Sequence, residues 1–95
     1  MLAIARALML NPSLLLLDEP MEGLAPIIVQ DLRRIISDLA EKSGMAVILV
    51  EQHARIALSI TQNAIVLEHG QIVHRSASAQ LSQNPELLHR LVAVA

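Results

Sequence analysis

The chain alternates between two short apolar runs and longer stretches in which apolar positions recur at helical spacing. The first run, residues 14–17, is four leucines, and it suits a strand buried on both faces better than an amphipathic helix. The second run, Ala46–Val50, is apolar and rich in β-branched residues. Residues 26–42 lie between them, begin with a proline and carry one apolar helical face, formed by Ile28, Leu32, Ile35, Ile36 and Leu39. Strand, helix and strand in this order predict a βαβ unit with parallel strands.

Shorter elements are predicted on either side of this unit. Residues 1–10 are strong helix formers, and an Asn-Pro pair follows as a stop signal. Residues 54–61 form a short helix. A hairpin comes next, with strands at residues 64–67 and 71–74 and a tight turn in which Gly70 suits a positive φ.

The end of the sequence is predicted to be helical. A short segment covers residues 78–81, and a second helix has Asn84 as its N-cap and Pro85 at its first position. The apolar stripe of that second helix consists of Leu87, Leu88, Leu91 and Val92.

The composition favours a sheet packed with aliphatic side chains. Of the 95 residues, 54% are hydrophobic, 17% are charged and none is aromatic. A buried parallel sheet needs helices on both faces and neighbouring strands, so we expect this chain to be part of a larger core and to be poorly soluble alone.

Charge and composition exclude several partners. The net charge is −2 and aromatic residues are absent, so nucleic acid is not expected as a partner. Cysteine is absent as well, which excludes disulfides and thiolate metal sites and fits a reducing cytosol. No apolar stretch approaches the roughly 18–20 residues that span a bilayer.

Polar residues with possible chemistry follow both strands. Asp18 and Glu19 come directly after the four leucines, and Glu51, Gln52 and His53 follow the second run. Because parallel strands end at the same edge of a sheet, we expect a metal-phosphate site there. The alternatives are a solvated turn for the two carboxylates and side-chain capping of the next helix for Gln52 and His53.

Four segments, in order, resemble the ATP-hydrolysing subunits of ABC transporters. MLAIARALM resembles the helix after the family's signature sequence, LLLLDEP its Walker B strand, MEGLA its D-loop, and Gln52 or His53 its switch position. EGLAP and VEQ look most like importers of branched-chain amino acids or urea. The resemblance implies an α/β fold: the C-terminal portion of a P-loop NTPase (RecA-like) core, with parallel strands, crossover helices, a terminal β-hairpin and helices. Residues 1–95 would be one partial ABC ATPase domain.

The resemblance also implies roles for individual residues. Asp18 would hold Mg²⁺ through water, and Glu19 would act as general base for the water that attacks ATP. Gly23 would shape the loop that meets a second ATPase subunit. Gln52, which falls at the usual switch-histidine position, or His53, one place later, would contact the phosphate. The subunit would be cytoplasmic and would attach to the inner face of the membrane through permease subunits.

The sequence departs from the family where phosphate would be bound. It contains no G-x-x-x-x-G-K-S/T loop, so we expect this chain to bind ATP weakly or not at all and to be part of a longer reading frame. Met21 and Ala25 replace the serine and aspartate that are commonest in the D-loop. Two functions stay open: a truncated ATP hydrolase of an importer, or a non-catalytic module that associates with complete subunits. The transported solute and the direction of transport are also open.

Overall fold

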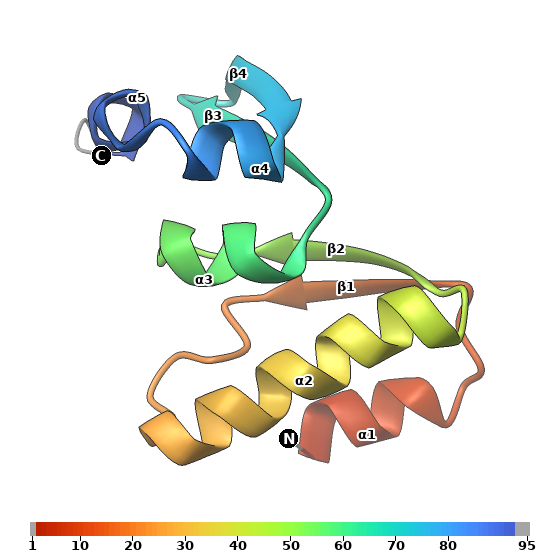
Figure 1. The fold of residues 1–95 in the computed structure, drawn as a ribbon. Coiled ribbons are helices and arrows are strands. Elements are labelled where there is room, and N and C mark those ends of the chain that lie inside the picture. Colours follow the sequence, from red (N-terminus) through yellow and green to blue (C-terminus); the bar gives the residue numbers. More distant parts are fainter. Residues whose placement is uncertain (1, 93–95) are drawn as a thin grey trace. The chain divides into compact units, whose positions relative to one another are not determined.

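The computed structural model describes residues 2–92 (Figure 1). Its contacts divide the chain into two compact units, and the division falls between Gln52 and His53. The first unit holds α1 (Leu2–Leu8), β1 (Leu14–Asp18), α2 (Pro26–Lys42) and β2 (Ala46–Val50). The second holds α3 (Ala54–Ile60), β3 (Asn63–Glu68), β4 (Gln71–Ala77), α4 (Ser78–Ser82) and α5 (Pro85–Val92).

The first unit is the predicted βαβ arrangement. β1 and β2 pair in parallel, with Leu14 opposite Ala46 and Asp18 opposite Val50. α2 is the crossover between them, as parallel neighbours require. These elements confirm a mixed α/β chain with parallel strands and a crossover helix.

β1 is buried on one face only, so the prediction of burial on both faces was wrong. Leu15 and Leu17 are 4% and 7% exposed, whereas Leu14 and Leu16 are 47% and 67% exposed. The cause is the arrangement of the helices: α1 and α2 lie on the same side of the two strands (Figure 1). The opposite face of β1, although equally apolar in sequence, is left open in this unit.

α2 follows the predicted bounds, but only the centre of its predicted apolar face is buried. Leu32 and Ile36 are buried, while Ile28 and Ile35 reach the surface at the edges of the stripe. Ala25 makes no side-chain cap, but its carbonyl accepts a hydrogen bond from the Val29 amide at 3.0 Å. The proline therefore starts this helix without a polar capping side chain.

α1 is shorter than the predicted helix over residues 1–10. It ends at Leu8, and Asn11 has a φ of 51°, which turns the chain toward β1. Met1, which the prediction included, lies outside the described residues. α3 likewise ends one residue early, because Thr61 is already extended.

The hairpin of the second unit is longer than predicted. β3 and β4 pair antiparallel from Asn63 opposite Ala77 to Glu68 opposite Gln71. His69 and Gly70 have φ values of 51° and 77°, so the glycine occupies the left-handed conformation expected of a two-residue hairpin turn. The register shifts between Val66 and Leu67, which leaves an extra residue on β4.

Hydrogen bonds close the end of α3, connect it to the start of α4 and cap the start of α5. The hydroxyl of Thr61 donates to the Ala57 carbonyl at 2.7 Å and lies 2.8 Å from the hydroxyl of Ser78, which is only 1% exposed. Because the single Thr61 proton is used, Ser78 is the donor between the two hydroxyls. The Leu87 amide donates to the Asn84 side-chain oxygen at 3.2 Å, which confirms Asn84 as the N-cap of α5.

The one-sided burial of β1 leads to a prediction about two adjacent leucines. Leu15→Ala should lower the free energy of unfolding of the first unit by about 2–5 kcal/mol, because it leaves a cavity under the helices. Leu16→Ala, the matched control, should change it by less than about 1 kcal/mol. Urea titrations followed by circular dichroism measure both, and equal losses would contradict one-sided burial.

Candidate functional site

The predicted carboxylates lie at the carboxyl edge of the parallel pair. Asp18 is the last residue of β1 and pairs with Val50, the last residue of β2. Asp18 is exposed and Glu19 is half-buried. Glu51 and Gln52 follow β2 directly, so the first unit brings Asp18, Glu19 and Gln52 to one edge of its sheet, as the sequence predicts.

Glu19 has a backbone conformation that side chains seldom adopt. Its φ is 48°, in the left-handed region, and such a residue costs roughly 1–3 kcal/mol unless its surroundings compensate. Two hydrogen bonds hold it there: its amide donates to the Val50 carbonyl at 2.7 Å, and its carbonyl accepts from the Glu22 amide at 3.2 Å. Strain at a candidate catalytic carboxylate is a signal that the sequence could not supply.

The loop after Glu19 turns twice before α2. The Leu24 amide donates to the Met21 carbonyl at 3.3 Å, and Gly23 has a φ of 74°. A Cβ on Gly23 would meet no atom within 4 Å, so glycine is needed there for its conformation and not for space.

Gln52 and His53 differ in their surroundings. Gln52 is exposed, and its backbone N–H donates to the Glu51 side-chain oxygen Oε1 at 3.1 Å. His53 begins the second unit and occupies the N-cap position of α3 without a side-chain capping bond. Its carbonyl accepts instead from the Ile56 and Ala57 amides at 3.1 and 3.2 Å. Side-chain capping by His53 is therefore not its role here.

The donor set at this edge suits a hydrated cation. Within residues 2–92, no group of three or more His, Asp or Glu side chains converges in a way that could hold a metal ion. Mg²⁺ usually keeps several waters and binds through one or two carboxylates together with substrate phosphates, so the exposed Asp18 carboxylate fits such a site. Two of the other histidines lie near polar groups: His74 Nε2 is 3.0 Å from Ser76 Oγ, and His69 Nε2 is 3.9 Å from Glu68 Oε1.

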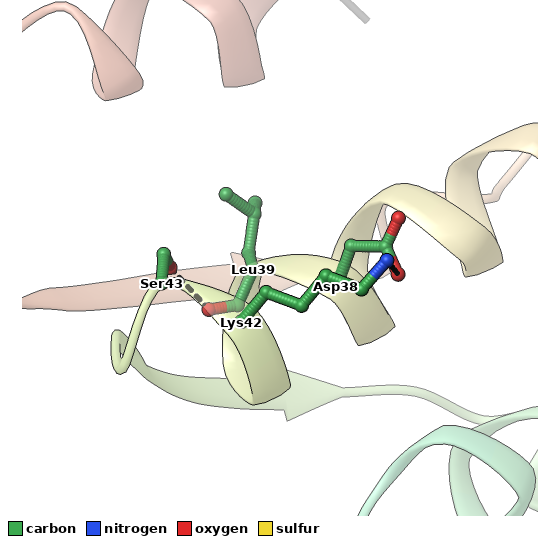
Figure 2. A network of polar contacts seen from close by, with 4 residues as sticks. All are labelled: Asp38, Leu39, Lys42 and Ser43. Carbon is green, nitrogen blue, oxygen red and sulfur yellow. Dashed lines mark hydrogen bonds and ion pairs between the residues drawn. The ribbon is translucent and has the colours of Figure 1, made fainter.

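A shallow depression lies at the other end of α2. Its volume is about 390 Å³ and it is lined by Ile35, Asp38, Leu39, Lys42 and Ser43. Figure 2 shows its polar groups occupied with one another: Lys42 Nζ lies 3.5 Å from Asp38 Oδ1, and the Ser43 hydroxyl donates to the Leu39 carbonyl. The loop after Glu19 enters α2 at Pro26, and the lining residues of the helix begin at Ile35, roughly 14 Å further along it, so the depression and the carboxylate edge are separate.

The helices of residues 2–92 include none that combines the length and the apolar character needed to cross a membrane.

Comparison with known proteins points to one kind of subunit, although no protein-family model matches the chain. The chain is 53% identical over 87 residues to the high-affinity branched-chain amino acid transport ATP-binding protein BraG of Pseudomonas aeruginosa. That match covers 92% of the chain and 37% of the relative. The chain is similar to a C-terminal part of an ABC transporter ATP-binding subunit. This finding confirms the resemblance stated from the sequence.

Two further relatives are ATP-binding proteins of other transport systems. The methionine import ATP-binding protein MetN of Campylobacter jejuni is 40% identical over 83 residues, which are 87% of the chain and 25% of the relative. The lipopolysaccharide export system ATP-binding protein LptB of Escherichia coli K12 is 36% identical over 81 residues, 85% of the chain and 33% of the relative. The chain thus spans about a third of the length of the curated relatives it matches.

The strained backbone of Glu19 makes a stability prediction. Because glycine adopts a positive φ without steric cost, Glu19→Gly should be more stable than Glu19→Ala by about 1 kcal/mol. At Glu22, which is exposed in the same loop and has no positive φ, the order should reverse. Urea unfolding of the four variants measures both differences in the free energy of unfolding. If Glu19→Ala is at least as stable as Glu19→Gly, the backbone of residue 19 is not strained.

Proposed function

We propose that this chain supplies the hydrolytic edge of an ATP-hydrolysing subunit that energises an ABC importer of branched-chain amino acids. The observation that carries the proposal is the position of Asp18 and Glu19. Asp18 is the last residue of β1, which pairs in parallel with β2, and Glu19 follows it, held in a strained conformation by the Val50 carbonyl. Adjacent carboxylates at the end of a parallel strand are suited to a metal and to a water, respectively.

Each polar residue at this edge has a separate part in the proposed reaction. Bound Mg²⁺ neutralises charge that develops on the phosphates during transfer to water. The exposed Asp18 carboxylate would hold that ion, which usually keeps several of its waters. The Glu19 carboxylate orients the attacking water and accepts its proton. Gln52, or His53 one residue later, hydrogen-bonds a phosphate oxygen.

The other half of the nucleotide site is proposed to lie outside residues 1–95. The sequence has no G-x-x-x-x-G-K-S/T loop whose amides and lysine would cradle the phosphates. The relatives are about three times as long as the matched region, which leaves room for that loop. Residues 1–95 are accordingly proposed to be one part of a P-loop NTPase domain, comprising the Walker B, D-loop and switch regions and the C-terminal helices.

The proposed setting follows from the names of the relatives. BraG is a branched-chain amino acid transport protein, whereas MetN and LptB serve methionine import and lipopolysaccharide export. The higher identity to BraG supports branched-chain amino acids as the solute. The subunit would work with a second ATPase subunit, met by the loop that contains Gly23, and with permease subunits at the cytoplasmic face of the membrane.

A second function is favoured by the same missing loop. A chain that lacks the phosphate cradle but keeps the loop between β1 and α2 could associate with complete subunits without turning over ATP.

The missing phosphate loop leads to a binding prediction for the chain itself. Titration of the 95-residue chain with MgATP in a calorimeter should show no saturable binding up to millimolar nucleotide, because Asp18 and Glu19 alone do not bind phosphates. Micromolar binding would contradict the division of the site proposed here.

The role of Glu19 can be tested in a hybrid in which this chain replaces the matching segment of BraG. Glu19→Gln should reduce ATP turnover by at least about 100-fold while leaving ATP affinity within a few-fold, because an amide cannot accept the proton. Glu22→Gln, an exposed carboxylate three residues away, is the matched control and should keep full turnover. Undiminished hydrolysis by Glu19→Gln in an active hybrid would remove Glu19 from this role.

A further inference from the structure

We propose that Met21 is a positioning residue: its buried side chain holds the loop after β1 and thereby keeps Glu19 in its left-handed conformation. The inference rests on the proposed function only for the consequence on ATP turnover. The claim about the loop stands on the structure of the first unit.

Met21 is the one buried residue of the loop between β1 and α2. Its side chain is 4% exposed, whereas Glu22, Gly23 and Ala25 are exposed and Leu24 is half-buried. An apolar side chain stabilises a turning segment mainly by leaving water, and the methionine side chain is flexible enough to fill an irregular space. Burial of this side chain therefore fixes the loop at this residue.

The backbone hydrogen bonds connect Met21 to Glu19. One turn closes from the Glu19 carbonyl to the Glu22 amide at 3.2 Å, and a second closes from the Met21 carbonyl to the Leu24 amide at 3.3 Å. Met21 lies inside the first turn and begins the second. Fixing its position therefore fixes both turns, while the amide of Glu19 is held separately by the Val50 carbonyl at 2.7 Å.

A strained residue needs this kind of support. A positive φ outside glycine persists only where the surrounding structure over-determines it. The turn hydrogen bonds lie next to exposed residues and compete with water, so they are weak when unprotected. Burial of Met21 keeps the turn closed, and loss of that burial would let Glu19 relax toward an ordinary backbone conformation.

The consequence for catalysis is one of geometry. Met21 has no group that could exchange a proton or ligate Mg²⁺, so it can act on turnover only by positioning other groups, and the Glu19 carboxylate is the nearest one proposed to react. Displacement of a reacting group by about 1 Å can cost about 100-fold in rate without removing it. Met21 substitutions should therefore lower kcat much more than they raise KM for ATP.

Amide hydrogen exchange of the full 95-residue chain tests the loop directly. Met21→Ala should accelerate exchange at the Glu19 amide at least about 10-fold more than at the Ile36 amide inside α2. Met21→Leu, which conserves volume, should keep the native rates. Met9→Ala, at a methionine that is 84% exposed, should also keep them. Ile4→Ala, a buried position outside the loop, should accelerate both amides by the same factor.

Equal acceleration at Glu19 and Ile36 in Met21→Ala would overturn the proposal, because it would show a general loss of stability. If Met21→Ala does not fold, Met21→Val removes less volume and is judged by the same ratio.

Kinetics of the BraG hybrid then separate this inference from the proposed function. Met21→Ala should lower kcat about 10–100-fold with KM for ATP changed less than about 3-fold, and Met21→Leu should restore kcat. An unchanged kcat together with an inactive Glu19→Gln hybrid would overturn the positioning role and leave the proposed function intact. If Glu19→Gln is fully active, the proposed function fails, while the exchange ratio still decides whether Met21 holds the loop.

Discussion

The parallel pairing of β1 with β2 is the constraint on which the rest of the first unit depends. Parallel neighbours cannot be joined by a short turn, so the chain must return along the sheet, and α2 provides that return. Burial of Leu32 and Ile36 holds the helix against the strands. The same pairing ends both strands at one edge, which is why residues some thirty positions apart in the sequence meet at the candidate site. The last contact of this edge is the hydrogen bond from the Glu19 amide to the Val50 carbonyl.

The first unit covers its strands with helices from one side only. Leu14, Leu16, Ile48 and Val50 form an open apolar row across the two paired strands. The hairpin of the second unit also exposes apolar side chains, at Ile65, Leu67, Ile72 and Val73. Contiguous apolar surface of this kind is uncommon on a monomer, and it agrees with a chain that spans about a third of its relatives.

Strain and burial meet in the loop that carries the candidate carboxylates. Glu19 and Gly23 both have a positive φ, which is unfavourable for a residue with a side chain and easy for glycine. Between them, Met21 is buried. A solvated turn would need neither the strained glutamate nor the buried methionine. The loop therefore combines backbone strain, which lowers stability, with burial that fixes its geometry, as is common at functional sites.

The sequence by itself determined the order and type of the elements. Apolar periodicity predicted α2 at its observed bounds and the paired strands, and local residue chemistry predicted the capped start of α5 and the positive φ of Gly70. Residue order also placed Asp18 and Glu19 at a strand end, and recognition of the transporter subunit followed from short motifs.

Only the tertiary structure decided which leucines of β1 are buried, because four consecutive leucines carry no alternation from which a face could be predicted. It also decided that Glu19 is left-handed, since that conformation is imposed by a hydrogen bond to Val50 on another strand. The burial of Met21 could not be predicted either, because a single methionine in a loop belongs to no periodic pattern. Apolar periodicity depends on the secondary structure that a segment prefers by itself, whereas backbone strain and side-chain burial depend on the tertiary contacts made by its neighbours.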